Sequence, residues 1–411
     1  MRFKFLKISQ KLAERLAVVG KLLAYRRTIG YLLKKRGIRA VYNFLYIKSF
    51  VMAGGEGTGN WISKILIEPL FRISPSLATK LTPYPFAVEI EITNRCNKKC
   101  IICEHTYWHE SNQDLSFEEF EKIVHQFPRL KWVNLTGEGD AFLNKDYLKM
   151  IEHLKAKDIP VFLVDSFDLI NREIAEKMIQ LGVNGIWISW DGATKETYEK
   201  IKVGCKFERS LNNIRNLIEL KRKMNSPIPE LCFRYIVTTL NVHEMPQFIE
   251  LVHSLGDRDS LGDGSSVEFA GLLIFDEVKH LSVEEIPEDL LQATMKKAEE
   301  LDVHMWFAHS SKSRLPPLER CRAWSEPYIM MGGYIMPCCA VLQNNDRGFL
   351  RKHAFGNILE TPFKEIWYSE RYKKFRQMIP QKDEKVPTLC RGCRAYDTSY
   401  REKRYGVSKE I

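Results

Sequence analysis

The chain has 411 residues, which exceeds one comfortable core, so two domains or a barrel with appendages are expected. Its net charge of +10 is uneven, because residues 1–55 hold 13 Lys and Arg against the single acid Glu14, and the remaining residues sum to −2. A uniformly basic face for nucleic acid is therefore not expected.

The ten cysteines are the next constraint on the environment of the protein. The first seven residues have neither a long apolar core nor a small-residue cleavage site, so no secretory leader is expected. In a reducing cytosol, clustered thiols indicate metal rather than disulfides. No apolar run approaches the roughly 20 residues that cross a bilayer, so we expect a cytoplasmic protein that does not span a membrane.

Residues 1–84 form the first predicted unit, a basic helical extension and linker. Apolar residues recur at helical spacing between basic ones within residues 1–50. Such cationic amphipathic helices can lie on an anionic membrane, here at its inner face. The alternative, a helical cap packed on the next unit with a solvated basic face, stays open. The Gly-rich stretch 54–60 lacks the Lys-Ser/Thr pair of a phosphate-binding loop and is predicted to be linker.

Residues 85–310 form the second predicted unit, in which short apolar runs alternate with helical patterns. Six strands are expected, at residues 86–93, 132–136, 161–164, 185–190, 231–237 and 267–274. Helical patterns separate them, at residues 117–127, 146–157, 172–181, 207–224 and 244–255, and a last helix is expected at 287–301. This alternation predicts a parallel α/β sheet covered by helices, with functional residues at the carboxyl ends of the strands.

The loop after the first predicted strand contains three cysteines within eight residues, Cys96, Cys100 and Cys103. Thiolates are the preferred ligands of iron-sulfur clusters. A cubane has four irons, so three cysteines leave one iron without a protein ligand, and an open position can bind and activate a small molecule. Three structural or zinc-binding cysteines are the alternative.

Two further stretches support the first interpretation. Strand two ends in Thr136-Gly137-Glu138-Gly139, and strand four continues into the block 186–201. With the C-x3-C-x2-C spacing, these stretches resemble the radical S-adenosylmethionine (radical SAM) superfamily. The resemblance implies a partial (β/α)6 TIM-like barrel and a 4Fe-4S cluster at Cys96, Cys100 and Cys103 whose open iron binds SAM. It also implies cleavage of SAM to a 5'-deoxyadenosyl radical that abstracts hydrogen from a substrate.

The same resemblance suggests cofactor-binding residues at the strand ends. Gly137 and Glu138 would hold the SAM ammonium group, although Gly139 replaces the proline of the family motif. Ser189 and Asp191 would meet the SAM carboxylate or ribose, and Asp165 and Ser166 the ribose, while capping of the next helix is the alternative for Ser189 and Asp191.

A buried charge is predicted within strand five, at Arg234. An inward Arg needs a partner, which would be a carboxylate of SAM or substrate, or a structural ion pair within the chain.

Residues 311–411 form the third predicted unit, with a second set of cysteines that could close every iron of another cubane. This set resembles the shortened SPASM, or twitch, iron-sulfur domain, which implies one auxiliary 4Fe-4S cluster at Cys321, Cys338, Cys390 and Cys393. A zinc ribbon with the same thiols is the alternative. Cys339 is expected to be a packed apolar residue, with a hydrogen donor or substrate-facing group as the other interpretation.

The resemblance implies an enzyme that oxidises a small polar molecule of the sugar or aminocyclitol type, with the auxiliary cluster as electron acceptor. One alternative is a maturase that modifies a ribosomal peptide or protein. A second, of another class, is an iron-sulfur binding or assembly factor without turnover. The expected partners are SAM, a small-molecule or peptide substrate, and a reductant such as flavodoxin or ferredoxin.

Overall fold

The computed structural model describes residues 25–46, 70, 73–256, 265–308, 325–344, 346–379 and 387–390. The predicted linker at 54–60 lies outside these residues, as do the first 24 residues of the predicted basic extension.

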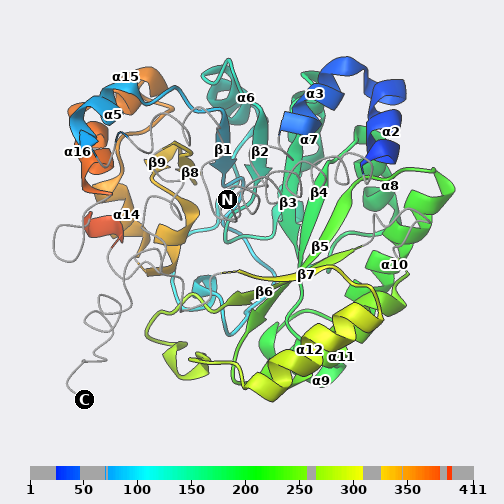
Figure 1. Cartoon of the computed structure of the whole chain (residues 1–411). Coiled ribbons are helices and arrows are strands. Elements are labelled where there is room, and N and C mark those ends of the chain that lie inside the picture. Colours follow the sequence, from blue (N-terminus) through cyan, green and yellow to red (C-terminus); the bar gives the residue numbers. More distant parts are fainter. Residues whose placement is uncertain are drawn as a thin grey trace, which may run out of the picture.

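One continuous sheet organises the described chain (Figure 1), with the strand order β7-β6-β5-β4-β3-β2-β1-β8-β9. All neighbours in this order pair in parallel except the hairpin of β8 and β9, which is antiparallel. The strands are β1 (Ala87–Ile90), β2 (Trp132–Leu135), β3 (Val161–Asp165), β4 (Gly185–Ser189), β5 (Glu230–Val237), β6 (Ser266–Gly271), β7 (Met305–Ala308), β8 (Tyr328–Met330) and β9 (Tyr334–Met336). The predicted α/β fold with a parallel sheet is confirmed.

Helices connect the parallel strands and cover the outside of the sheet (Figure 1). They are α6 (Phe117–His125), α7 (Tyr147–Ala156), α8 (Arg172–Leu181), α9 (Lys195–Ile201), α10 (Phe207–Lys223), α11 (Met245–Ser254) and α12 (Glu288–Glu300). Outside this series lie α2 (Arg26–Arg36), α3 (Ile38–Tyr46), α5 (Pro75–Leu81), α14 (Arg347–His353), α15 (Phe363–Trp367) and α16 (Glu370–Met378). The helix patterns read from the sequence each correspond to one of the first group.

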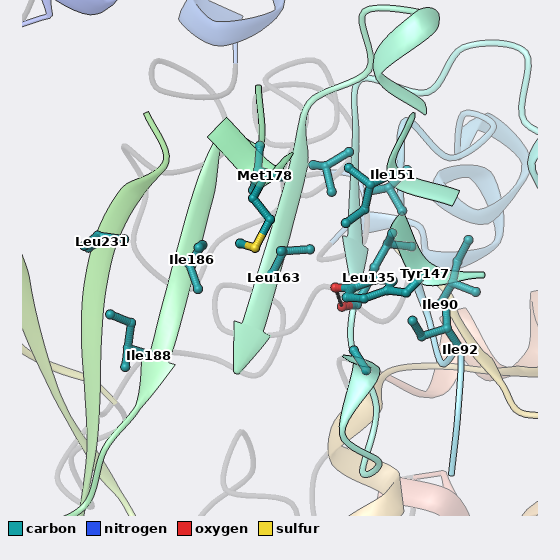
Figure 2. Close-up of a cluster of buried hydrophobic side chains, with 14 of the residues drawn as sticks. Ile90, Ile92, Leu135, Tyr147, Ile151, Leu163, Met178, Ile186, Ile188 and Leu231 are labelled. Atoms are coloured by element: carbon teal, nitrogen blue, oxygen red, sulfur yellow. Dashed lines mark hydrogen bonds between the residues drawn. The ribbon is translucent and has the colours of Figure 1, made fainter. Parts of the chain in front are cut away.

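The main core lies between the sheet and these helices. Figure 2 shows Leu163 of β3, Ile186 of β4 and Met178 of α8 within this cluster, and each is fully or almost fully buried. Successive strand residues point to opposite faces, so the intervening residues face inward. At one end of the inner face, Ala87, Trp132 and Phe162 form a smaller apolar cluster with Trp187. Other inward positions carry polar or charged side chains, among them Glu89, Asn134, Arg234 and Glu268.

Two features of the sheet were not predicted. A seventh parallel strand, β7, pairs with β6 and follows α12, which was expected to be the last helix of the barrel. In addition, β8 pairs in parallel with β1, so the C-terminal unit extends the barrel sheet instead of standing apart from it. Residues of α15 and α16 share the main core with the barrel. The barrel and the described C-terminal helices are therefore parts of one packed body.

The helices α2 and α3 pack against the barrel rather than projecting from it. Leu32, Val41 and Phe44 form an apolar cluster with Ile228, which precedes β5. Arg36 donates to the carbonyl oxygens of Gln180 and Leu181 at the C-terminal end of α8, at 3.0 and 2.5 Å, and so satisfies carbonyls that have no partner within the helix.

The opposite side of this helix pair is exposed and basic. Leu33 is 51% and Ile38 is 73% exposed, and basic residues surround them. In the described part of the chain, no helix has the length and apolarity required to span a membrane.

Truncation of a buried side chain of the central sheet should destabilise the whole fold. We expect Leu163→Ala to lower the free energy of unfolding by about 2–5 kcal/mol, because Leu163 is fully buried and the cavity would lie in the middle of the core. Leu33→Ala is the matched control, and at this exposed position the change should stay within about 0.5 kcal/mol. Guanidinium unfolding of both variants measures the difference, and equal effects would contradict this description of the core.

Candidate functional site

The loop with Cys96, Cys100 and Cys103 lies directly after β1, as predicted. Backbone hydrogen bonds attach it to the end of α9 and the residues that follow, from the Lys99 nitrogen to the Val203 oxygen at 2.8 Å and from the Ile101 nitrogen to the Ile201 oxygen at 2.9 Å. The Thr106 hydroxyl also donates to the Cys100 carbonyl at 2.7 Å. The loop is therefore attached to the barrel at α9 and tightened by a hydrogen bond of its own.

The three thiols occupy one buried region and influence one another's titration. Burial raises the pKa of Cys96, raises that of Cys100 to about 11, and raises that of Cys103 well above its usual value. For Cys103, the electrostatic contributions of Cys100 and Cys96 add to the effect of burial. Metal binding would thus have to displace three thiol protons.

A cluster suits this arrangement better than a single ion. Among the residues that the structure describes, no three His, Cys, Asp or Glu side chains converge on a point that could hold one metal ion. In a cubane each thiolate binds a different iron, so three thiols on one short loop suit a 4Fe-4S cluster.

Two buried lysines, Lys98 and Lys202, lie beside the thiols. The ammonium of Lys98 forms an ion pair with Asp140 and donates to the Asn97 side chain at 3.1 Å. Burial alone would lower the pKa of Lys98, but Asp140 and Asp165 outweigh it and the pKa is raised. Lys98 therefore stays charged, and its charge in turn lowers the pKa of Cys96.

Lys202 occupies the place between two predicted cofactor residues. Its ammonium lies 2.8 Å from the Ser189 hydroxyl and 2.9 Å from the Asp191 carboxylate. Asp191 also accepts from the Ile236 nitrogen at 2.8 Å, so its carboxylate joins β4 to β5. The structure thus gives Ser189 and Asp191 partners within the chain, and Lys202 lowers the pKa of Cys100 against the effect of burial.

The turn after β2, with Gly137, Glu138 and Gly139, packs closely against the cysteine loop. A Cβ on Gly139 would lie 2.4 Å from the carbonyl oxygen of Thr93 and 2.7 Å from that of Arg95. A Cβ on Gly137 would lie 2.5 Å from the Cγ of Glu91. Both positions therefore require glycine for close approach. For Gly139 this explains why no bulkier residue stands where the family motif has proline.

Glu138 itself is buried beside a positive charge. An Arg347 nitrogen lies 3.3 Å from one carboxylate oxygen of Glu138. Burial raises the pKa of Glu138 to about 8, and Arg347 opposes this rise while Glu91 adds to it. A cation brought to Glu138 would thus stabilise its ionised form.

Asp165 and Ser166 lie at the end of β3. Asp165 accepts from the Phe167 nitrogen at 2.6 Å, and burial together with Asp140 raises its pKa to about 7. The Ser166 hydroxyl is buried and has no hydrogen-bond partner among the described residues. A buried hydroxyl without a partner is costly, so Ser166 fits a position that a polar ligand completes.

The inner face of the sheet carries an ion pair and a hydrogen-bonded acid. Arg234 of β5 donates to Glu268 of β6 at 2.5 Å and lies over the Trp187 ring at 5.7 Å. The ion pair within the chain, which was one of the two predicted partners for Arg234, is present. The Arg234 side chain nevertheless keeps 35% exposure, so the inner face is accessible at this point.

A second polar group lies at β1 and β2. Glu89 accepts from the Asn134 side-chain nitrogen at 2.9 Å, whereas the Asn134 side-chain oxygen is buried without a partner in the described chain. Cys339 reaches the same carboxylate from the C-terminal unit, and burial followed by Glu89 raises the pKa of its thiol well above the usual value. Cys339 therefore packs against the apolar C-terminal core, as expected, and also lies beside Glu89 of the inner face.

Of the four predicted auxiliary ligands, the structure describes two. Cys338 follows β9 and packs against both the main core and the C-terminal core, and Cys390 is a member of the main core. The other two, Cys321 and Cys393, lie outside the described residues.

Sequence reasoning missed four charged residues of the site, Lys98, Lys202, Glu91 and Arg347. Lys98 stands between Cys96 and Cys100, and Lys202 directly follows the block 186–201, so their positions were a usable signal. The pairing of Glu91 with Arg347, which spans 256 residues, left no local signal.

Two family models match this chain. The model of the radical SAM superfamily matches residues 90–252, and that of the SPASM iron-sulfur cluster-binding domain matches residues 321–394. The first match includes the cysteine loop and the ends of β2 to β5. The second includes all four predicted auxiliary ligands.

Individual relatives are distant. The tungsten-containing aldehyde ferredoxin oxidoreductase cofactor-modifying protein of Pyrococcus furiosus is 23% identical over 70% of this chain and 82% of its own length. The mycofactocin maturase of Mycolicibacterium smegmatis is 22% identical over 42% of this chain and 43% of its own. The crystal structure of Streptococcus suis SuiB bound to precursor peptide SuiA has a TM-score of 0.56 at 14% identity, covering 87% of this chain and 84% of that one.

The packing of Gly139 against the cysteine loop generates a prediction. We expect Gly139→Ala to lower the iron bound per chain after anaerobic reconstitution by at least half, because the added Cβ would displace the backbone that leads into Cys96. Gly30→Ala is the control, since a Cβ there meets nothing within 4 Å. Iron and sulfide analysis measures the outcome, and full iron loading of Gly139→Ala would contradict the predicted dependence.

Proposed function

The chain belongs to the radical SAM superfamily and carries a SPASM-type iron-sulfur domain, and from this premise we propose that the enzyme oxidises a polar substrate at the inner face of its sheet. When bound at Cys96, Cys100 and Cys103, a 4Fe-4S cluster would supply the electron that cleaves SAM to a 5'-deoxyadenosyl radical. The observation that carries the proposal is the charged yet accessible inner face, on which Arg234 keeps 35% exposure beside Glu268.

The chain's own residues would hold SAM at the carboxyl ends of the strands. Glu138, with the close backbone approach that Gly137 allows, suits the ammonium group. The Ser166 hydroxyl, buried and without a described partner, suits a ribose hydroxyl. Lys98 and Lys202 would balance the negative charge of the thiolates.

The inner face also indicates the kind of substrate. Arg234, Glu268 and Glu89 are charged, and the Asn134 oxygen has no described partner. A buried polar group left unsatisfied favours a ligand that supplies hydrogen bonds. A small polar molecule of the sugar or aminocyclitol type would do so.

In the proposed reaction one C–H bond of the substrate breaks and a C=O bond forms from a C–OH group. The hydrogen atom would leave in 5'-deoxyadenosine, and the hydroxyl proton would pass to a base. Cys321, Cys338, Cys390 and Cys393 would hold an auxiliary cluster that, when bound, supplies an acceptor for the remaining electron. Of these cysteines, Cys338 adjoins Cys339, which lies beside Glu89 of the inner face. A flavodoxin or ferredoxin would supply the electron for SAM cleavage.

A peptide or protein substrate is the second candidate. It is favoured by the relationship to a maturase and by the structural similarity to a protein crystallised with its precursor peptide. A longer substrate could place one side chain at the same inner face while the rest of the peptide lies outside the barrel.

The basic face of α2 and α3 supports a further partner, an anionic membrane surface. Lys34, Lys35 and Arg39 are exposed beside Leu33 and Ile38, which joins positive charge to exposed apolar side chains. This combination favours binding at a lipid headgroup region.

SAM cleavage is the direct test of the proposed activity. We expect the anaerobically reconstituted protein, given a reductant and SAM, to form 5'-deoxyadenosine and to contain about eight irons per chain. Cys100→Ala should abolish 5'-deoxyadenosine and remove about four irons, whereas Cys338→Ala should remove about four irons and leave SAM cleavage measurable. Chromatographic assay and iron analysis measure both quantities.

Cys205→Ala is the matched control, because Cys205 is a buried thiol on the same side of the barrel that the proposal does not use as a ligand. No 5'-deoxyadenosine from the iron-loaded wild-type protein would indicate a binding factor without turnover, and about four irons with one zinc would favour the zinc ribbon. Small metabolites and peptides from the host, tested separately for stimulation of 5'-deoxyadenosine formation, distinguish the two substrate classes.

Membrane binding should depend on the exposed charges of α2 and α3. We expect the triple variant Lys34→Gln, Lys35→Gln and Arg39→Gln to bind phosphatidylserine vesicles about a hundredfold more weakly, since each basic residue near an anionic surface contributes about 1 kcal/mol. The control variant removes three exposed basic residues elsewhere, Lys296, Lys364 and Arg371. Vesicle sedimentation measures binding, and equal sedimentation of both variants would refute a membrane role for this face.

A further inference from the structure

A buried arginine of the C-terminal unit, Arg347, reaches into the barrel. It is the first residue of α14, and only 6% of its side chain is exposed. Its two terminal nitrogens donate to the two carboxylate oxygens of Glu91, at 2.7 and 2.6 Å. This bidentate geometry is the strongest pairing that an arginine makes with a carboxylate, and it fixes the plane of the guanidinium group.

The same guanidinium group also contacts a second carboxylate. The nitrogen that donates to Glu91 at 2.6 Å lies 3.3 Å from Glu138, and the Arg347 plane is held over the Trp108 ring at 4.8 Å. The contact with Glu138 is longer than either contact with Glu91. Arg347 therefore contacts both carboxylates in a fixed orientation, and its hydrogen bonds to Glu91 are shorter than its hydrogen bond to Glu138.

Three carboxylates lie around Arg347. Glu110, which pairs with Arg351 of the same helix, lies 3.9 Å from the Arg347 Nε. Among the described residues, two guanidinium groups therefore face Glu91, Glu110 and Glu138, and the group is neutral when Glu138 is protonated. When Glu138 is ionised, the group is complementary to one further cation, such as an ammonium group.

The carboxylates come from three different segments next to the cysteines. Glu91 follows β1, Glu138 follows β2, and Glu110 lies beyond the cysteine loop. Arg347 connects all three to the C-terminal unit. We propose that Arg347 is a positioning residue that holds the Glu138 carboxylate in place for the ammonium group of SAM, so that SAM affinity depends on the docked C-terminal unit. This inference rests on the proposed role of Glu138 in binding SAM.

Substitution of Arg347 in the full-length, reconstituted protein tests the inference. We expect Arg347→Gln to weaken SAM binding about 10- to 100-fold in equilibrium dialysis, with the iron content per chain unchanged. Arg347→Lys, which keeps the charge but loses the bidentate geometry, should have a smaller effect and serves in its place if Arg347→Gln does not fold. The electron paramagnetic resonance spectrum of the reduced cluster should change on SAM addition in each variant only at correspondingly higher SAM concentrations.

Arg376→Gln controls for general damage to the C-terminal unit. Arg376 is fully buried, donates to the Trp367 carbonyl oxygen at 2.9 Å and stacks on the Trp367 ring at 3.9 Å, so these contacts lie within the C-terminal unit. We expect this variant to lower the melting temperature while leaving SAM affinity within about twofold. Equal loss of SAM affinity in Arg376→Gln and Arg347→Gln would overturn the inference.

A double-mutant cycle separates positioning from attachment. If Arg347 acts through Glu138, Arg347→Gln should have little further effect on SAM affinity in a Glu138→Gln background. Additive effects would mean that Arg347 acts only by fastening the C-terminal unit through Glu91, and would overturn the inference. A Glu138→Gln single variant that binds SAM like the wild type would instead refute the proposed role of Glu138 itself.

Discussion

The parallel pairing of β1 with both β2 and β8 is the interaction on which the rest of the structure depends. Because β1 pairs with β2, the cysteine loop after β1 and the glycine turn after β2 emerge side by side at one edge of the sheet. Because β1 also pairs with β8, the C-terminal unit is placed against the same edge. One four-residue strand thus aligns the parts that supply the thiols, the glycine turn and the buried arginine.

Burial of charge is the second constraint on this region. Several ionisable groups lie beside the cysteines, and each buried lysine has a nearby carboxylate, Lys98 with Asp140 and Lys202 with Asp191. Such pairs add little to stability, because the desolvation of both partners offsets their attraction. Their effect is instead electrostatic: Lys98 and Lys202 oppose the rise that burial causes in the pKa of Cys96 and Cys100, although burial dominates and both pKa values stay raised. The two ammonium groups would stabilise thiolates once a metal displaces the thiol protons.

Sequence analysis predicted the features that depend on local pattern. The spacing of Cys96, Cys100 and Cys103, the first six strands and the covering helices all leave a period or a motif within a short window. The strand β7 was missed because it is only four residues long and follows the helix that was expected to be the last of the unit. The position of Arg234 on an inner face was predicted, but the choice of Glu268 as its partner required the register of β5 with β6.

Contacts between distant segments could not be predicted in the same way. The residues that join the C-terminal unit to the barrel, Arg347 and Cys339, look like an ordinary basic helix residue and an unassigned thiol in the sequence. Their roles depend on β1 and the residue after it, because Glu89 and Glu91 stand two residues apart and thus point to the same face. Glu91 accepts hydrogen bonds from Arg347, and Glu89 lies beside the Cys339 thiol.

These two contacts between the C-terminal unit and the barrel lie at different positions along the chain after and within β1. The pairing of Glu91 with Arg347 lies beside the glycine turn and fixes charges near the cysteine loop, whereas the pairing of Glu89 with Cys339 lies deeper along the same strand, beside Asn134. The alternation of a strand forces both carboxylates to face inward, so each needs a partner that the barrel helices outside cannot provide. A C-terminal unit docked on the open side of the sheet meets both needs at once. The docking of the C-terminal unit is therefore favoured by Glu89 and Glu91 as well as by the apolar core of that unit.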